Sequence, residues 1–262
     1  MTVVEAALPP IGEAVAARQI LIQAVEAQMH KLIWVGRSSP DGGEQTAQHA
    51  SSYHLTSGGH RIRAQLAVHA SLALCLPVGD AVAIAAAAEL IHNASLIHDD
   101  LQDRDLMRHG VAAVWSLYGD GIAICAGDLL LSAAYCALSA LTRPHLLPIL
   151  IPMVHSRIVD ASIGQCVDLT SQKNRVCSFE DYARLASLKS GSLLALPIEL
   201  ALAAAGELQA IPLARRAAES FSVGYQVFDD LKDVKKDLMR ATAQPAINVV
   251  SVLQACNPAA DA

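Results

Sequence analysis

The sequence predicts an all-α protein, and three observations lead to that prediction. The chain has 262 residues, which is enough for one large domain with a substantial core. Apolar residues make up 53% of it and charged residues only 17%, so it is rich in core material rather than disordered. Aromatic residues make up only 4%, and alanine and leucine dominate, which favours packed helices over a β-sandwich. We expect a single domain over residues 1–262.

Apolar residues recur at helical spacing along most of the chain, and glycine and proline residues mark the breaks. A first helix is expected at 11–36, followed by the polar loop GRSSPDGGEQ. Gly58 and Gly59 precede the next helix, and a long helix is predicted at 80–104 after Pro77 and Gly79. Later helices, separated by Gly110, Pro144, Gly191, Gly206 and Pro212, are predicted at 119–141, 146–170, 179–189, 191–205 and 210–237. No alternating strand pattern is evident, so the sequence predicts a bundle of long helices.

Composition also limits the partners and the location of the protein. A net charge of −6 and a pI of about 5.9 disfavour nucleic acid, which usually meets a basic surface. The N-terminal stretch MTVVEAALPPIGEAVAARQ lacks the basic start and apolar run of a signal peptide. The apolar runs AVAIAAAAELI and LLALPIELALAAAG contain charges or proline, so we expect core helices of a cytoplasmic protein without a transmembrane segment. The six cysteines have no zinc-binding spacing, and buried free thiols are expected.

Two acidic clusters of the form DDxxD end two of the predicted helices. Asp99 and Asp103 are four residues apart and share one helical face, with Asp100 beside them. The second cluster repeats this spacing and consists of Asp229, Asp230 and Asp233. Carboxylates this close repel one another unless a cation neutralises them, and Mg²⁺ commonly joins carboxylates to a substrate phosphate. We interpret the clusters as ligands for Mg²⁺ and a diphosphate, against the alternative that each is a solvated helix end.

Further motifs stand in a fixed order around the two clusters, over roughly residues 55–237. The motifs are GGHRIRA, HNASLIHDDLQD, LMRHG, GDLLLSAAY, GQCVDL, KSG and GYQVFDDLKD. In this order they resemble the motifs of the trans-isoprenyl diphosphate synthases, and the chain is identified as a member of the polyprenyl synthetase family. The resemblance implies an isoprenoid-synthase-type bundle of long helices around a central apolar cavity, and usually a homodimer.

The resemblance also implies a reaction. A Mg²⁺-dependent prenyltransferase of this kind condenses an allylic prenyl diphosphate with isopentenyl diphosphate. About three Mg²⁺ ions per active site would be bound by the aspartates and would neutralise the leaving diphosphate. The allylic cation then forms in a cavity that excludes water, the double bond of isopentenyl diphosphate attacks it, and a proton is lost.

Roles are carried over to the residues that match the family motifs. Lys189 matches the lysine that contacts the allylic diphosphate, and Gln226 and Gln165 match the glutamines of the second aspartate motif and of the GQxxD motif. The residues expected to act in catalysis are Asp99, Asp100, Asp103, Lys189, Gln226, Asp229 and Asp230. The residues expected to bind the diphosphate of isopentenyl diphosphate are His60, Arg63, His92, Arg108 and His109. Taken alone, Lys189 would be a surface lysine and His92 a core histidine, so both roles depend on the motifs.

The chain departs from the family pattern in three places. His60 stands where the family has lysine, and His109 where it has the second arginine of RRG. A histidine with an unperturbed pKa near 6.5 carries positive charge only partly at neutral pH, so the isopentenyl diphosphate site looks altered. The third departure is the short region after about residue 237. Three nearby lysines either replace the charge of the family's missing loop or form a solvated helix end, and these are Lys232, Lys235 and Lys236.

These departures leave two alternatives beside chain elongation. One is a terpene synthase-like enzyme that ionises one prenyl diphosphate without isopentenyl diphosphate. The other is a weakly active partner subunit of a hetero-oligomeric prenyl synthase, against which the intact aspartate motifs argue.

Product length in this family is set by side chains just upstream of the first aspartate motif. The position five residues before Asp99 is Ala94, with Ser95 next to it and Ile91 a turn further back. Small side chains would leave the shaft open, so we expect a product longer than fifteen carbons, namely geranylgeranyl diphosphate. Replacing Ala94 with phenylalanine is expected to shorten it.

Overall fold

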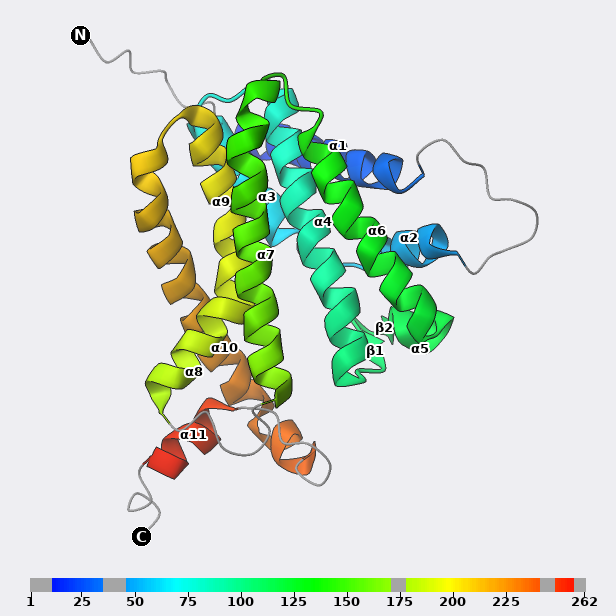
Figure 1. Ribbon diagram of the computed structural model, residues 1–262, viewed down its shortest axis with the longest axis vertical. Coiled ribbons are helices and arrows are strands. Elements are labelled where there is room, and N and C mark those ends of the chain that lie inside the picture. The colour runs from blue at the N-terminus through cyan, green and yellow to red at the C-terminus, as the bar shows by residue number, and fades with distance from the viewer. Residues whose placement is uncertain (1–10, 35–45, 171–177, 241–247, 257–262) are drawn as a thin grey trace.

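The computed structural model describes residues 11–34, 46–170, 178–240 and 248–256, and within them it is almost entirely helical (Figure 1). The side chains of residues 11–17, 233–240 and 255–256 lie outside the description. The first helices are α1 (Ile11–Ile33), α2 (Ala47–Thr56), α3 (Ile62–Ala73) and α4 (Val78–Asp103). A short hairpin of β1 (Met107–Arg108) and β2 (Val111–Ala112) leads to α5 (Val114–Tyr118) and α6 (Asp120–Leu138). The all-α prediction is confirmed.

The second half of the chain is also helical. A 3₁₀ turn, η1 (Pro144–Leu146), precedes α7 (Leu147–Thr170). A continuous run then joins α8 (Phe179–Ala186), the π-helical turn η2 (Ser187–Gly191) and α9 (Ser192–Ala205). The turn η3 (Leu208–Ala210) leads into α10 (Ile211–Arg240), and α11 (Val249–Cys256) follows.

Helix α4 lies at the centre of the bundle, where it packs against α3 and α6 and also contacts α1 and α9. Its middle is a run of buried alanines, Ala83 and Ala85–Ala88, whose small side chains let neighbouring helices approach closely. Helix α9 packs against α3, α7 and α10 on the other side. Figure 1 shows α4, α6, α7, α9 and α10 running along the long axis, while α1 and α2 cross them at one side. The apolar runs predicted to be core helices are therefore in the core.

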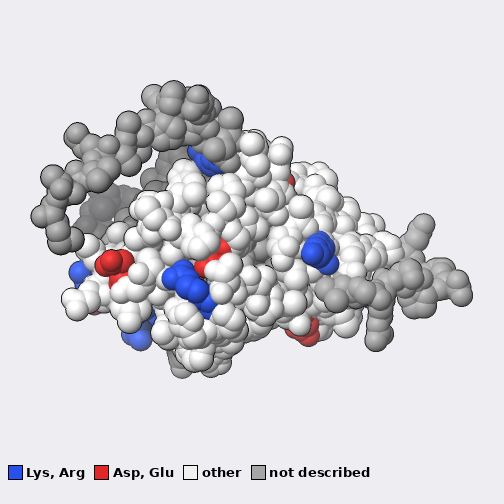
Figure 2. Space-filling model, turned by 90° about the horizontal axis from the view of Figure 1, so that it is seen from above, with Lys and Arg blue, Asp and Glu red and all other residues white. Residues whose placement is uncertain are grey.

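Both aspartate motifs lie at the same end of the bundle. The C-terminal ends of α4 and α10 point toward the bottom of Figure 1, where α8 and α11 are also found. Figure 2 shows the opposite end, where Lys, Arg, Asp and Glu side chains are scattered singly over a largely uncharged surface. On the face that Figure 2 shows, no basic patch gathers. The acids predicted to act together thus share one end of the fold.

The structure differs from the predicted elements at several points. Helices α2 and α11, the β1–β2 hairpin and α5 were not predicted, because each is short and lies in a polar or mixed segment. Gly191 was expected to break the chain between two helices, and that prediction is wrong, since it lies inside the helical run. A Cβ there would meet Ser222 Oγ at 2.7 Å, so glycine serves close packing against α10.

One composition-based expectation is wrong, and a second, the absence of a transmembrane segment, stays a prediction. The four cysteines whose side chains are described, Cys75, Cys125, Cys136 and Cys166, are free but exposed rather than buried. Four helical stretches, Val78–Asp103, Asp120–Leu138, Pro144–Thr170 and Phe179–Ala205, are long and apolar enough to span a membrane by length and composition. The fold buries 72% of the first apolar window and 67% of the last, but only 22% of the window in the α7 stretch.

Candidate active site

The first aspartate motif lies at the C-terminal end of α4, where Arg104 ends the helix in the left-handed conformation (φ 57°). The chain turns back through the β1–β2 hairpin, whose turn residues His109 and Gly110 both have positive φ. The hairpin returns Arg108 to α4, where its Nε lies 2.9 Å and 3.0 Å from the two carboxylate oxygens of Asp100. The Asp100 carboxylate is buried and already paired with a cation of the protein itself.

Among the described side chains, no ion pair of Asp99 or Asp103 within 4 Å corresponds to that of Asp100, and Lys189 acts on both at longer range. Burial raises the pKa of Asp99 to about 6, Lys189 opposes that shift, and the charge of Asp103 adds to it. Burial, against the opposing charge of Lys189, also raises the pKa of Asp103. Both carboxylates are therefore destabilised as anions, and an added cation would relieve them. Their oxygen donors on one helical face fit a hard divalent cation such as Mg²⁺.

Lys189 is held in the π-helical turn Ser187–Gly191, an irregularity that is often found at functional sites. Its Nζ lies 2.5 Å from Asp168 Oδ2 on α7. Helix α7 can approach the turn because residue 164 is glycine: a Cβ there would meet the Lys189 backbone nitrogen at 2.6 Å. Although burial alone would lower it, Asp168 and the first motif raise the pKa of Lys189 and keep it charged.

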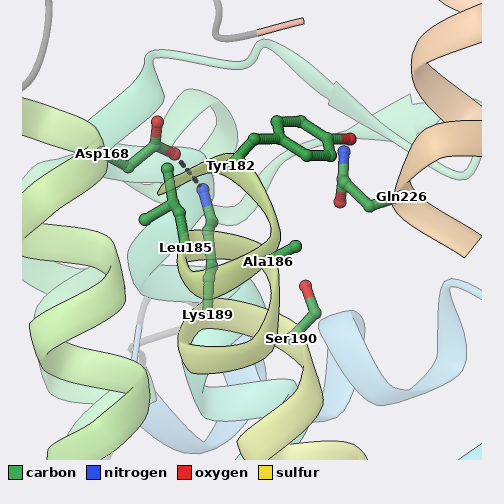
Figure 3. Close-up of a pocket in the computed structure, with 7 residues that line it drawn as sticks. All are labelled: Asp168, Tyr182, Leu185, Ala186, Lys189, Ser190 and Gln226. Atoms are coloured by element: carbon green, nitrogen blue, oxygen red, sulfur yellow. Dashed lines mark hydrogen bonds and ion pairs between the residues drawn. The ribbon is translucent and has the colours of Figure 1, made fainter. Parts of the chain in front are cut away.

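Gln165 follows Gly164 on α7 and reaches α4. Its amide nitrogen donates to Gln102 Oε1 at 3.0 Å, while its own Oε1 is buried without a hydrogen-bond partner in the described part of the protein. Figure 3 shows the small pocket, of about 80 Å³, that surrounds Lys189. Lys189 reaches Asp168 there, and the ring of Tyr182 points toward Gln226 on α10. This pocket joins α7, α8 and α10.

The second aspartate motif lies on α10, and its members are not equivalent. Asp230 is buried and accepts hydrogen bonds from Tyr182 Oη and Gln226 Nε2, each at 2.7 Å. Asp229 is half-exposed, and its Oδ1 lies 3.9 Å from Lys232 Nζ. The side chain of Asp233 lies outside the described residues, as do those of Lys235 and Lys236. Among the described side chains, no group of three or more His, Cys, Asp or Glu is arranged to hold a metal ion.

The residues predicted to bind isopentenyl diphosphate come together in one cavity of about 450 Å³. Its lining includes all of them, namely His60, Arg63, His92, Arg108 and His109. Leu96 on α4 and Gln226 on α10 line the same cavity, so it extends between the helices that carry the two aspartate motifs. Residues from three segments of the sequence, 60–63, 92 and 108–109, therefore line one cavity.

The electrostatics of this cavity favour an anion. Burial lowers the pKa of Arg63 to about 10, and its Nε is buried without a hydrogen-bond partner among the described groups. Burial, with Arg63 and other cations nearby, lowers the pKa of His92 well below its usual value, so His92 is neutral at pH 7. The charge of Glu89 opposes the shift at Arg63, and a diphosphate would give the Arg63 Nε an acceptor.

Comparison with known proteins decides the family. The family model described as polyprenyl synthetase matches residues 44–244. The chain belongs to the polyprenyl synthetase family. It resembles the solved geranylgeranyl pyrophosphate synthetase from Geoglobus acetivorans, with a TM-score of 0.79 at 24% identity over 90% of this chain and 75% of that one. It also resembles the geranyltranstransferase from Thermotoga maritima, with a TM-score of 0.76 at 25% identity over 92% of this chain and 86% of that one.

Curated members of the polyprenyl synthetase family are similar in sequence but longer. The short chain isoprenyl diphosphate synthase of Methanothermobacter thermautotrophicus is 34% identical over 74% of this chain and 60% of that protein. The geranylgeranyl diphosphate synthase of Mycobacterium tuberculosis is 33% identical over 78% of this chain and 61% of that protein. The chain thus spans about three fifths of the length of the curated relatives that it matches.

An apolar cavity of about 190 Å³ begins beside Asp99 and Lys189 and runs along α4. Ile91 and Ser95 line it, but Ala94 is fully buried in the core and is not part of the lining. Bulky side chains from other helices also reach it, and these are Leu131, Ile158, Leu169 and Leu193. In this member of the polyprenyl synthetase family, the position expected to form the floor therefore faces the core.

Asp168 and Tyr182 bond to the predicted site residues Lys189 and Asp230 but were not themselves predicted. Asp168 lies three residues after Gln165 and one helical turn after Gly164, so the GQxxD spacing could have identified it as a partner for Lys189. Tyr182 lies seven residues before Lys189, which places both on one face two turns apart. Since tyrosine carries no charge, the sequence offered no electrostatic signal for it.

Proposed function

We propose that this protein is a Mg²⁺-dependent trans-prenyltransferase that condenses an allylic prenyl diphosphate with isopentenyl diphosphate. One arrangement carries the proposal: a cationic cavity and an aspartate-tipped apolar cavity lie on either side of Lys189 and Ser190. Ser190 lines the cationic cavity, and Lys189 lines the apolar one. A reaction that joins two diphosphate substrates at their hydrocarbon ends needs two such sites side by side.

The cationic cavity would bind isopentenyl diphosphate. Arg63 and Arg108 provide fixed charge, and His60 and His109 line the cavity beside them. Neutral His92 can donate one hydrogen bond to a phosphate oxygen. Arg61 also lines the cavity but is paired with Glu26 and Glu89, so it orients the loop more than it binds the anion.

Asp99 and Asp103, together with Asp229 and Asp233 from α10, would hold about three Mg²⁺ ions. When bound, Mg²⁺ supplies Lewis-acid assistance to the departing diphosphate of the allylic substrate. Lys189 would contact the same diphosphate and balance its charge. The carbon–oxygen bond then breaks, the double bond of isopentenyl diphosphate forms the new carbon–carbon bond, and one proton is lost.

The apolar cavity would hold the allylic tail and exclude water from the cation. We propose geranylgeranyl diphosphate as the product. The small side chain of Ser95 favours this length, and two of the relatives are named geranylgeranyl diphosphate or pyrophosphate synthases. Leu131, Ile158 and Leu169 would limit the length of the tail.

Incubation of the purified protein with Mg²⁺ and farnesyl diphosphate, with and without isopentenyl diphosphate, tests this function. A longer prenyl diphosphate formed only with isopentenyl diphosphate supports it. A hydrocarbon or alcohol formed without isopentenyl diphosphate would instead indicate a terpene synthase, an alternative favoured by His60 and His109. No product in either case would indicate a weakly active partner subunit. Asp99→Ala should abolish turnover, whereas Glu207→Gln, an exposed carboxylate at the other end of the bundle, should not.

We also propose that the protein is a cytoplasmic homodimer that pairs through α6 and α7. Helix α7 carries an outward apolar groove lined by Ile158, Val159 and Ile163, and Ile124 on α6 is 49% exposed. Sedimentation should give a dimer that Ile163→Glu dissociates. Recovery of the protein only with membranes after cell fractionation would contradict the cytoplasmic location and point to lipid as the partner of this face.

A further inference from the structure

The carboxylate of Asp230 is a junction of three helices. Its Oδ2 accepts hydrogen bonds from Tyr182 Oη on α8, at 2.7 Å, and from the backbone N–H of Val249 on α11, at 2.8 Å. Its Oδ1 accepts from Gln226 Nε2, one turn earlier on α10, at 2.7 Å. In addition, Asn248 Nδ2 donates to the backbone oxygen of Asp230 at 2.9 Å.

This junction is buried and has a small apolar core of its own. Asp230 is 6% exposed and Tyr182 is 3% exposed. Tyr182, Val249 and Val252 form a cluster separate from the main core, with Val227 and Val250 packed at its edge. Burial, together with the bond to Asp230, raises the pKa of Tyr182, so the phenol remains a donor at any physiological pH. The negative carboxylate at the N-terminus of α11 also interacts favourably with the dipole of that helix.

The neighbouring Asp229 has a different environment. It is half-exposed, and its nearest charged partner in the described region is Lys232, at 3.9 Å. The first motif shows the same difference between its first two aspartates. Asp100 is paired with Arg108, whereas Asp99 lines the apolar cavity. In each motif the second aspartate is therefore occupied by donors of the protein.

We propose that Asp230 is an anchor rather than a metal ligand, and that Tyr182 is a positioning residue which acts through it. Tyr182 belongs to the same helical run as Lys189, so its bond to Asp230 fixes the distance between Lys189 and the second aspartate motif. The same carboxylate fastens α11 against α8 and α10. The kinetic part of this inference rests on the proposed function, but the anchoring part does not.

Hydrogen exchange of the metal-free protein tests the anchor without any substrate. Tyr182→Phe removes only the hydroxyl and leaves the ring in its apolar cluster. We expect amides of residues 248–254 to exchange about tenfold faster in Tyr182→Phe and in Asp230→Asn, because a charge-assisted bond is lost. The double variant should exchange no faster than the worse single variant, since both changes break one linkage. Tyr135→Phe on α6 makes the same atomic change elsewhere and should leave this segment unaffected.

Calorimetric binding of Mg²⁺ with inorganic pyrophosphate tests the positioning role. Tyr182→Phe and Asp230→Asn should weaken binding to a similar, several-fold extent, and Asp229→Asn should weaken it far more without changing exchange at 248–254. Wild-type exchange in both Tyr182→Phe and Asp230→Asn would overturn the anchor. Loss of binding in Asp230→Asn as severe as in Asp229→Asn, with Tyr182→Phe unaffected, would make Asp230 a metal ligand instead. If the wild-type protein bound no pyrophosphate, the proposed function would fail while the exchange result still decided the anchor.

Discussion

Arg108 and Asp100 form a two-pronged ion pair between the hairpin and the end of α4, with Arg108 Nε within 3.0 Å of both carboxylate oxygens of Asp100. The pair links the two halves of the candidate site, because Arg108 also lines the cationic cavity and Asp100 adjoins Asp99, which lines the apolar cavity. Through this pair the hairpin turn of His109 and Gly110 holds Arg108 against the first aspartate motif.

Replacing Arg108 with methionine should therefore damage both stability and binding. The buried Asp100 carboxylate would lose its partner, and we expect the free energy of unfolding to fall by about 3 kcal/mol. The Michaelis constant for isopentenyl diphosphate should rise as well. Urea unfolding and steady-state kinetics measure the two effects. Arg104→Met, which removes an exposed ion pair with Asp120, is the control and should change neither much.

Asp99 should make the stability of the metal-free protein depend on pH. Its pKa is raised to about 6 in the folded state, chiefly by burial, so the folded state binds the proton more tightly than the unfolded state. Stability is therefore lost as the pH rises from about 4 to about 6, and the full penalty applies above that range. Asp99→Asn should stabilise the metal-free protein by about 1–3 kcal/mol at pH 7.5 and by little at pH 4. Equal effects at both pH values in urea unfolding would contradict the assignment.

Gly164 should be essential for the position of Lys189. A methyl group at this position would meet the Lys189 backbone nitrogen at 2.6 Å and its Cα at 2.9 Å, which forces α7 away from the π-helical turn. Gly164→Ala should destabilise the protein by about 1–3 kcal/mol and reduce turnover at saturating substrate. Gly79→Ala is the control, because a Cβ at residue 79 has nothing within 4 Å, and it should leave turnover intact. A similar loss of turnover in Gly79→Ala would show that the effect of Gly164→Ala does not come from contact with Lys189.

Restoring a fixed charge in the cationic cavity should improve binding of the second substrate. His109→Arg should lower the Michaelis constant for isopentenyl diphosphate severalfold, because arginine carries a fixed positive charge. His69→Arg on α3 adds the same charge outside this cavity. If neither kinetic constant of His109→Arg changes, residue 109 does not contact the diphosphate.

Product length offers a test that separates neighbouring positions. The sequence pattern predicts that Ala94→Phe shortens the product, but Ala94 is buried in the core, and a phenyl ring there should chiefly destabilise the fold. Ser95 lines the apolar cavity, so Ser95→Phe should shorten the product with a smaller loss of stability. Chromatography of the products, together with thermal unfolding of both variants, distinguishes the two positions.

Much of this arrangement could be predicted from the sequence, because it depends on patterns that survive folding. The run of alanines in α4 predicted a buried helix. The motifs grouped five residues between His60 and His109 as one binding site, and these residues line one cavity in the structure. Other features depend on contacts between distant segments. The sequence does not reveal that Asp230 meets Val249 on α11, nor that Gly191 faces Ser222 rather than ending a helix. Aspartates that look equivalent in the DDxxD pattern thus have different environments in the folded protein.

A crystal structure with Mg²⁺, a non-hydrolysable farnesyl diphosphate analogue and isopentenyl diphosphate would test the central claim most directly. We predict metal ions between the analogue and Asp99, Asp103 and Asp229, the prenyl tail beside Ser95, and isopentenyl diphosphate against Arg63 and Arg108. Metal ions bound away from these acids, or a cationic cavity that stays empty at saturating isopentenyl diphosphate, would contradict the two-substrate mechanism.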